Sequence, residues 1–167
     1  LALYFSLGDW GWHDGKNPDL LKKQLTELLT HYGPIEYLWL DVAAGDGGLP
    51  YAETVKHVRS LQPSCLTGFN VTGISSPAAK APGDPGDLLL CEEGLPAPYE
   101  GPGAREFAKP ISGQWFYHAD NQNLKMPAET IYYLYRGAEM FGNLFSLDVG
   151  PDENGNLRPQ DLQAMRQ

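Results

Sequence analysis

A carboxylate and an indole stand two residues apart near the end of the apolar segment 36–42. Strand alternation places Trp39 and Asp41 of this segment on the same side, so the carboxylate ends the strand beside the ring. An indole offers an apolar platform to a sugar ring, and a neighbouring carboxylate can attack the sugar or accept a hydrogen bond from it. The pair therefore indicates a carbohydrate site, whereas Asp41 alone would also suit a helix cap or a loop brace.

Two further carboxylates, Glu92 and Glu93, close the predicted strand 87–92. Either could act as a general acid, a role that glutamate takes in many hydrolytic sites. The alternative is that both are solvated acids at the exit of a strand. Asp148 ends another predicted strand, where the glycine–proline turn that follows gives it an equally good structural role.

The chain also carries more aromatic side chains at predicted strand ends and loops than packing alone requires. Aromatic residues are mostly core residues, but they also line ligand sites. The residues concerned are Tyr4, Trp10, Trp12, Trp39, Trp115 and Tyr117.

The elements that must position these side chains follow an order of strand and then helix. Continuous apolar runs predict buried strands, and apolar residues at helical spacing predict amphipathic helices between them. The predicted strands are 1–7, 36–42, 65–70, 87–92, 111–118 and 143–149, and the predicted helices are 18–31, 51–61, 128–141 and 159–167.

This alternation is typical of an α/β fold in which helices cover a parallel sheet. An open doubly wound sheet and a (β/α)8 barrel both fit it. The sequence contains neither G-x-G-x-x-G nor the phosphate-loop pattern, so a nucleotide-binding domain is disfavoured and we favour the barrel. Because six strands are too few for eight, residues 1–167 are predicted to be the C-terminal part of one barrel domain, incomplete at its N-terminus.

Composition excludes several classes of partner. The chain has 12 lysines and arginines against 21 aspartates and glutamates, a net charge of −9, which would repel nucleic acid and anionic membranes. No apolar run is long enough to span a bilayer. The histidines show no H-E-x-x-H or paired spacing, so we expect no metal site.

Four stretches carry a pattern that can be compared with known families: Tyr4–Trp10 (YFSLGDW), Gln24–Asp41 (QLTELLTHYGPIEYLWLD), Trp115–His118 (WFYH) and Asn143–Asp152 (NLFSLDVGPD). Together they resemble the α-L-fucosidases of glycoside hydrolase family 29, whose closing strand is usually written N-L-L-L-N-V-G-P. The resemblance implies a barrel that cleaves terminal α-L-fucose from glycans or fucosides with retention and without a cofactor.

The resemblance also implies roles for individual residues. In that family the aspartate of a Trp-x-Asp strand is the nucleophile, which corresponds to Asp41, and its indole, here Trp39, lines the fucose site. The acid/base glutamate often follows the pattern G-D-[FY]-x-T-x-E, and Gly86–Glu92 keeps its Gly-Asp and its Glu. Glu92 is therefore the expected acid/base residue, with Glu93 as the alternative.

The fucose site implied by the resemblance needs apolar and polar side chains together. Aromatic rings suit the methyl group and C–H faces of fucose, and polar side chains suit its hydroxyl groups. The candidates for substrate binding are Tyr4, Trp10, Trp39, Asn70, Trp115, Tyr117 and His118.

The chain departs from the family pattern in several places, and one of them is Gly86–Glu92, which has neither the aromatic residue nor the threonine of the acid/base pattern. Many members carry an arginine on the strand where this chain has Gly68-Phe69-Asn70, and Asp148 replaces a usual asparagine. An alternative function is therefore that of a non-hydrolytic carbohydrate-binding homologue of the same barrel. The resemblance suggests a secreted, periplasmic or lysosomal protein. We expect residues 1–167 by themselves to be aggregated or molten and to show no fucosidase activity, because upstream barrel strands are missing from them.

Overall fold

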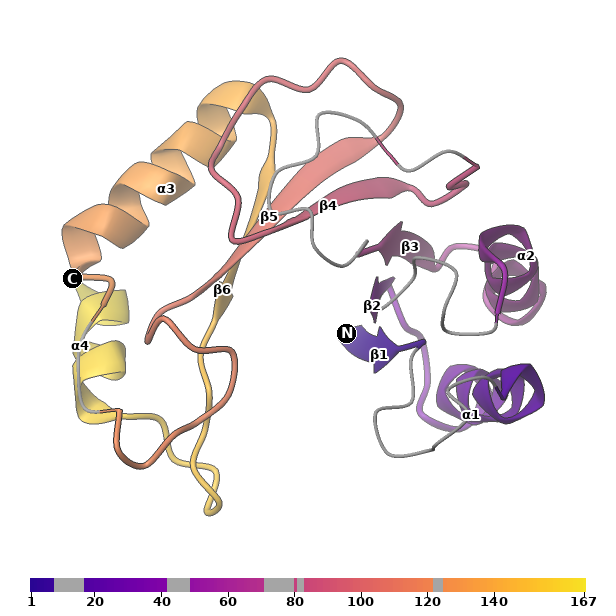
Figure 1. The fold of residues 1–167 in the computed structure, drawn as a ribbon, viewed down its shortest axis with the longest axis horizontal. Coiled ribbons are helices and arrows are strands. Elements are labelled where there is room, and N and C mark those ends of the chain that lie inside the picture. The colour runs from indigo at the N-terminus through magenta and orange to yellow at the C-terminus, as the bar shows by residue number, and fades with distance from the viewer. Residues whose placement is uncertain (8–16, 42–48, 71–79, 81–82, 122–124) are drawn as a thin grey trace. The chain divides into compact units, whose positions relative to one another are not determined.

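The computed structural model describes residues 1–7, 17–41, 49–70, 80, 83–121 and 125–167. Trp10, one of the predicted substrate-binding residues, lies outside these ranges. The described residues form two compact units, drawn in Figure 1. The first unit contains Leu1–Leu90 and Gly101–Gly103, and the second contains Cys91–Glu100 and Ala104–Gln167.

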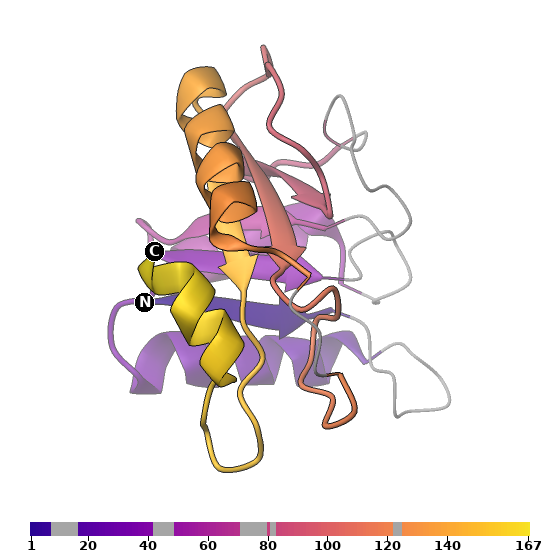
Figure 2. The same ribbon diagram turned by 90° about the vertical axis from the view of Figure 1, so that its left-hand side faces the viewer.

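The first unit alternates parallel strands with helices. Its elements are β1 (Ala2–Ser6), α1 (Pro18–His31), β2 (Tyr37–Asp41), α2 (Tyr51–Leu61), β3 (Leu66–Phe69) and the start of β4 (Leu88–Glu92). The strands pair in chain order, with Ala2 opposite Tyr37 and Tyr37 opposite Leu66. Both helices cover the same face of these strands (Figure 1), and α1 runs alongside β1 (Figure 2).

Local sequence explains why α1 begins where it does. Pro18 occupies the first turn, where its missing N–H removes no hydrogen bond, and the Asn17 side chain accepts a hydrogen bond from the Leu20 N–H at 3.0 Å. Leu21, Leu25 and Leu29 follow at intervals of one helical turn and are all buried. The helix therefore presents a leucine stripe to the sheet.

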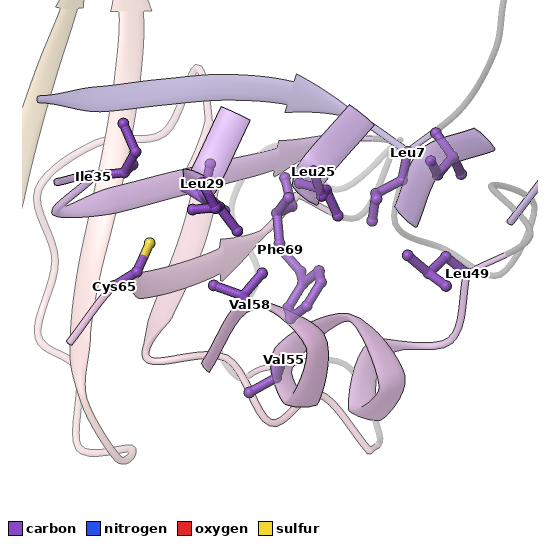
Figure 3. Packing of buried hydrophobic residues seen from close by; sticks show 12 residues of the cluster. Leu7, Leu25, Leu29, Ile35, Leu49, Val55, Val58, Cys65 and Phe69 are labelled. Carbon is purple, nitrogen blue, oxygen red and sulfur yellow. The ribbon is translucent and has the colours of Figure 1, made fainter. Parts of the chain in front are cut away.

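A hydrophobic core joins the two helices of the first unit to its strands (Figure 3). Leucines from α1 and valines from α2 meet apolar side chains from the strands and their connections. The residues labelled in Figure 3 are Leu7, Leu25, Leu29, Ile35, Leu49, Val55, Val58, Cys65 and Phe69.

The second unit repeats the pattern with fewer elements. After the last two residues of β4 it contains β5 (Ala104–Pro110), α3 (Ala128–Phe141), β6 (Leu144–Asp148) and α4 (Pro159–Arg166). Strand order again follows chain order, and β5 pairs in parallel with β6 from Glu106 opposite Leu144 to Pro110 opposite Asp148. The helix α3 lies beside β6 in both views (Figures 1 and 2).

One predicted strand is wrong. The segment 111–118 is not a strand but a series of turns and irregular backbone, and the strand of this region is β5, at Ala104–Pro110. Charged side chains and a final proline made 104–110 resemble a surface loop, yet Arg105 and Glu106 are buried. The four predicted helices and the other five predicted strands are confirmed, with ends that differ by at most two residues.

Parallel strands in chain order, with helices in several of the connections, are the repeating unit of a (β/α) barrel. Among the described residues, no helix combines the length and the apolar character that crossing a membrane requires.

Candidate active site

Asp41 is the last residue of β2, and it is half-buried. Each of its carboxylate oxygens accepts a hydrogen bond from a side chain of a different strand or strand end. The Tyr4 hydroxyl donates to Oδ2 at 2.6 Å, and the Asn70 side-chain amide donates to Oδ1 at 2.8 Å. Two donors on opposite oxygens hold the carboxylate in one orientation.

Parallel register explains why these three side chains meet. Tyr4 of β1 lies opposite Trp39, two residues before the Ser6–Asp41 pair, and therefore shares a face with Asp41. Asn70 directly follows β3, and its backbone N–H donates to the Leu40 carbonyl at 2.7 Å, which extends the ladder one residue further. With 1% of its surface exposed, Asn70 is a fixed partner for the carboxylate.

An aromatic surface lies next to the carboxylate. The rings of Tyr4 and Trp39 stack with their centroids 5.6 Å apart and their planes 24° apart, and Tyr4 remains largely exposed. Trp39 lies opposite Gly68, where a Cβ would come within 2.8 Å of the Tyr37 hydroxyl and of a Leu90 methyl group. Glycine at this position therefore leaves room for the side chains of Tyr37 and Leu90.

The two glutamates at the end of β4 differ in burial and in backbone conformation. Glu92 is half-buried, whereas Glu93 is exposed and adopts a left-handed backbone with φ of 52°. The Glu93 N–H donates to the Ala108 carbonyl at 2.9 Å, and its own carbonyl accepts from the Lys109 ammonium at 3.0 Å. Glu93 therefore lies in the turn that follows β4, whereas Glu92 is the last residue of that strand.

The remaining predicted binding residues belong to the second unit, in the segment that follows β5. Trp115 and Tyr117 are half-buried there, and His118 is exposed. The structure thus brings Tyr4, Trp39 and Asn70 to Asp41, and it places Glu92 and the Trp115–His118 segment in the other unit.

Sequence reasoning missed a set of buried polar side chains on β5. Glu106 is 2% exposed and accepts a hydrogen bond from the Ser146 hydroxyl at 2.5 Å. Arg105 is 3% exposed and donates to the Leu95 carbonyl at 2.7 Å and to Asn143 Oδ1 at 3.1 Å. A short run of charged residues in a predicted loop offered no local signal for this burial.

Asp148 also ends a strand, as its position in the sequence predicts. Its Oδ2 is buried and has no hydrogen-bond partner among the residues that the structure describes. Burial disfavours the charged form and raises the pKa of this carboxyl from 3.8 to about 6.

Groups that bind metal ions do not cluster in the described ranges, where no three His, Cys, Asp or Glu side chains gather closely enough to hold one. Cys65 and Cys91 are both buried, and they are not joined in a disulfide. Burial is the main cause that raises the pKa of each, to about 11 for Cys65, so both are neutral thiols near pH 7.

Residues 4–167 match the family described as Alpha-L-fucosidase. The whole chain is 28% identical, over 193 residues, to Alpha-L-fucosidase 1 of Arabidopsis thaliana, of which it covers 37%. Its fold is similar to that of α-L-fucosidase isoenzyme 1 from Paenibacillus thiaminolyticus, with a TM-score of 0.77 and 25% identity over 97% of this chain and 46% of that one. It is also similar to α-L-fucosidase AlfC from Lactobacillus casei in complex with its α-L-fucose product, with a TM-score of 0.73 and 23% identity over 99% of this chain and 57% of that one.

The chain spans between 37% and 57% of the length of these three relatives. Their likeness confirms the predicted fold class, because the six parallel strands and their helices correspond to part of a (β/α)8-type catalytic barrel. With a family match that extends over nearly every residue, the chain belongs to the α-L-fucosidase family.

Proposed function

We propose that the full-length protein hydrolyses terminal α-L-fucose from glycans or fucosides with retention of configuration, and that Asp41 is its nucleophile. The observation that carries the proposal is the Asp41 carboxylate, held by Tyr4 and Asn70 beside the Trp39 ring at the end of a parallel strand. In barrel enzymes the carboxyl ends of the strands carry the catalytic groups. Membership of the α-L-fucosidase family supports fucose as the sugar of the substrate.

In the first step, a carboxylate oxygen of Asp41 forms a bond to the anomeric carbon of fucose. The bond between that carbon and the leaving oxygen breaks at the same time, and Glu92 donates its proton to the leaving oxygen. The product of this step is a fucosyl ester of Asp41 and a free alcohol.

In the second step, Glu92 is a carboxylate and acts as the base. It takes a proton from water as the water oxygen bonds to the anomeric carbon, and the bond from that carbon to Asp41 breaks. Both carboxyl groups return to their first state, and the two inversions give net retention.

The neighbouring side chains support these steps by orientation and contact. Tyr4 and Asn70 fix the orientation of the Asp41 carboxylate, so this side chain loses little conformational freedom when substrate binds. Trp39, and from the second unit Trp115, offer apolar surfaces to the methyl group and C–H faces of fucose. Tyr117 and His118 offer polar groups to its hydroxyls.

The decisive experiment replaces the nucleophile in the full-length protein. Asp41→Gly should lower turnover of an aryl α-L-fucoside by about 10³-fold or more, because no covalent intermediate can form. Added azide fits the space left by the side chain and should restore turnover in part, with β-fucosyl azide as its product, detected by NMR.

Wild-type enzyme in the same azide buffer is the control and should release fucose alone. Turnover of Asp41→Gly close to that of wild type would remove Asp41 from the mechanism. A wild-type protein that binds fucose but neither turns over the fucoside nor forms an ester on Asp41 would instead be a carbohydrate-binding homologue.

A further inference from the structure

Away from Asp41, the second unit contains a buried ion pair that contacts a segment far from it in sequence. Arg158 immediately precedes α4 and Asp161 lies in its first turn, with side chains that are 8% and 1% exposed. The Nε and Nη2 atoms of Arg158 donate to the two carboxylate oxygens of Asp161, each at 2.8 Å. Its remaining nitrogen, Nη1, donates to the backbone carbonyl of Asn121.

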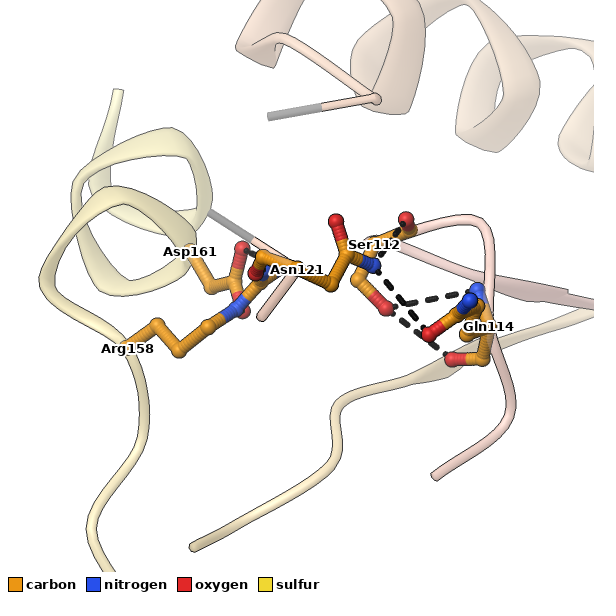
Figure 4. A network of polar contacts seen from close by, with 5 residues as sticks. All are labelled: Ser112, Gln114, Asn121, Arg158 and Asp161. Carbon is orange, nitrogen blue, oxygen red and sulfur yellow. Dashed lines mark hydrogen bonds and ion pairs between the residues drawn. The ribbon is translucent and has the colours of Figure 1, made fainter. Parts of the chain in front are cut away.

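Asn121 connects this ion pair to the segment that follows β5 (Figure 4). Its side-chain amide donates to the Ser112 carbonyl at 3.1 Å, and its backbone N–H donates to the His118 carbonyl at 3.0 Å. The Ser112 hydroxyl donates to the Gln114 carbonyl at 2.9 Å and accepts from the Gln114 N–H at 3.3 Å. These contacts tie the two ends of segment 112–121 together.

A glycine contacts the middle of the same segment. A Cβ at Gly150 would lie 2.7 Å from the backbone nitrogen of Tyr117 and 3.1 Å from the carbonyl carbon of Phe116. Backbone atoms cannot give way as the end of a flexible side chain can, so this close approach requires glycine. The Phe116–Tyr117 peptide therefore packs directly against the backbone of Gly150, two residues after β6.

We propose that Arg158 and Asp161 are positioning residues that hold the aromatic segment Trp115–His118 in the conformation that receives the sugar. The inference rests on the proposed function, in which Trp115 and Tyr117 contact fucose. The segment follows the carboxyl end of β5, and loops at that end of barrel strands carry the ligand site.

Stability alone does not account for this ion pair. Burial of two charges costs desolvation energy, and a well-packed apolar pair of similar volume is often at least as stabilising. An apolar pair cannot, however, donate a hydrogen bond to the Asn121 carbonyl. The hydrogen bond that an apolar pair would lose is thus the one from Arg158 to Asn121, whose own N–H donates to His118 of the aromatic segment.

The test distinguishes a role in stability from a role in positioning the aromatic segment. It compares two double variants of the full-length protein. Arg158→Met with Asp161→Leu removes both buried charges, fills their volume and leaves neither partner unpaired. The matched control is Arg136→Met with Glu139→Leu, an ion pair of the same i,i+3 spacing on α3 whose side chains are 58% and 42% exposed.

We expect the Arg158/Asp161 variant to raise KM for an aryl α-L-fucoside about tenfold and to change kcat less than about twofold, because the binding surface is disordered while the nucleophile is untouched. Backbone amides of 113–121 should exchange hydrogen faster, measured by mass spectrometry, with β5 and β6 unchanged. The Arg136/Glu139 control should match wild type in both measurements.

A folded Arg158/Asp161 variant with wild-type KM and wild-type exchange in 113–121 would overturn the proposal. If that variant does not fold, Asn121→Ala keeps the ion pair and removes the bond to Ser112, and it must show the same two changes or the inference fails. A wild-type enzyme without fucosidase activity would refute the proposed function. In that case the hydrogen-exchange measurement still tests whether the ion pair holds segment 113–121, since faster exchange in the Arg158/Asp161 variant would support this and unchanged exchange would exclude it.

Discussion

Both hydrogen bonds to Asp41 come from uncharged donors, a phenol and an amide. A cationic donor in contact with a carboxylate favours its charged form strongly and so weakens it as a nucleophile. Asn70 directly follows β3, and its side-chain amide donates to the carboxylate that we propose as the nucleophile. Among the described residues, these two donors thus orient the Asp41 carboxylate without themselves adding positive charge to it.

The choice between Glu92 and Glu93 can be tested with substrates that differ in their leaving groups. If Glu92 is the acid, Glu92→Ala should slow fucosides with poor leaving groups by about 10²-fold or more and activated aryl fucosides far less, because the latter depart without protonation. The measurement is kcat/KM for a series of leaving groups of rising pKa.

Glu93→Ala is the matched control, since it removes the same side chain one residue later. Its backbone forms the turn after β4, so the variant should show no dependence on the leaving group beyond that of wild type. The reverse pattern would assign acid/base catalysis to Glu93.

Asp148 should make stability depend on pH. Burial raises the pKa of its carboxyl from 3.8 to about 6, so the folded state favours the neutral acid. The resulting stabilisation is complete below pH 4 and is lost as pH rises toward and through 6. Asp148→Asn cannot ionise, and we expect it to be more stable than wild type by about 3 kcal/mol at pH 7.5 and equal to it near pH 3.5, by urea unfolding of the full-length protein.

Asp152 provides a control of opposite sign. Hydrogen bonds from the backbone of Asn156 and Asn154 lower the pKa of its carboxyl, so this carboxylate stabilises the fold above pH 4 and loses that effect as pH falls. Asp152→Ala should therefore reduce stability at pH 7.5. An Asp148→Asn effect of equal size at both pH values would show that ionisation is not its cause.

At the scale of elements, the helices were the most predictable part of the chain. Local signals mark the ends of two of them: the Asn17 cap and Pro18 begin α1, and the left-handed Gly142 ends α3 with its N–H bonded to the carbonyls of Ala138 and Glu139. Strands with continuous apolar runs, such as Tyr37–Asp41, were predictable for the same reason. These signals lie within a few residues of the element that they define.

The strand β5 could not be predicted because its partners are distant in sequence. Glu106 is bonded to Ser146, and Arg105 to Asn143, each about 40 residues further along the chain. Burial of such groups is stable only when their hydrogen bonds are made, and a single segment does not reveal the partner. The run Ala104–Pro110 therefore had the composition of a loop.

The candidate site shows the same division. Asp41 and Trp39 share one strand, so alternation alone placed them on one face. The hydrogen bonds of Tyr4 and Asn70 to Asp41 depend on the register between β1, β2 and β3, which sequence does not give. The hydrogen bond from Arg158 to the Asn121 carbonyl joins residues 37 apart in sequence, and it could not be predicted from sequence for the same reason.

At the scale of the whole molecule, β1 and β6 are the two edge strands of the sheet that the described residues form. A strand at such an edge carries backbone groups that can pair with another chain. Leu144 of β6 is 47% exposed, as is Leu66 of the interior strand β3. The two leucines are thus equally exposed, but Leu144 lies on an edge strand and Leu66 on an interior strand.

We therefore expect residues 1–167 alone to self-associate through edge strands and to form larger species as their concentration rises, measured by sedimentation velocity. Leu144→Lys should reduce this association, because a charged side chain on an edge strand opposes pairing with a second chain. Leu66→Lys makes the same change of charge and hydropathy on an interior strand and should leave association near that of the unmodified chain. An equal reduction by both variants would attribute association to exposed apolar surface, and a monodisperse monomer at all concentrations would show that neither edge is open.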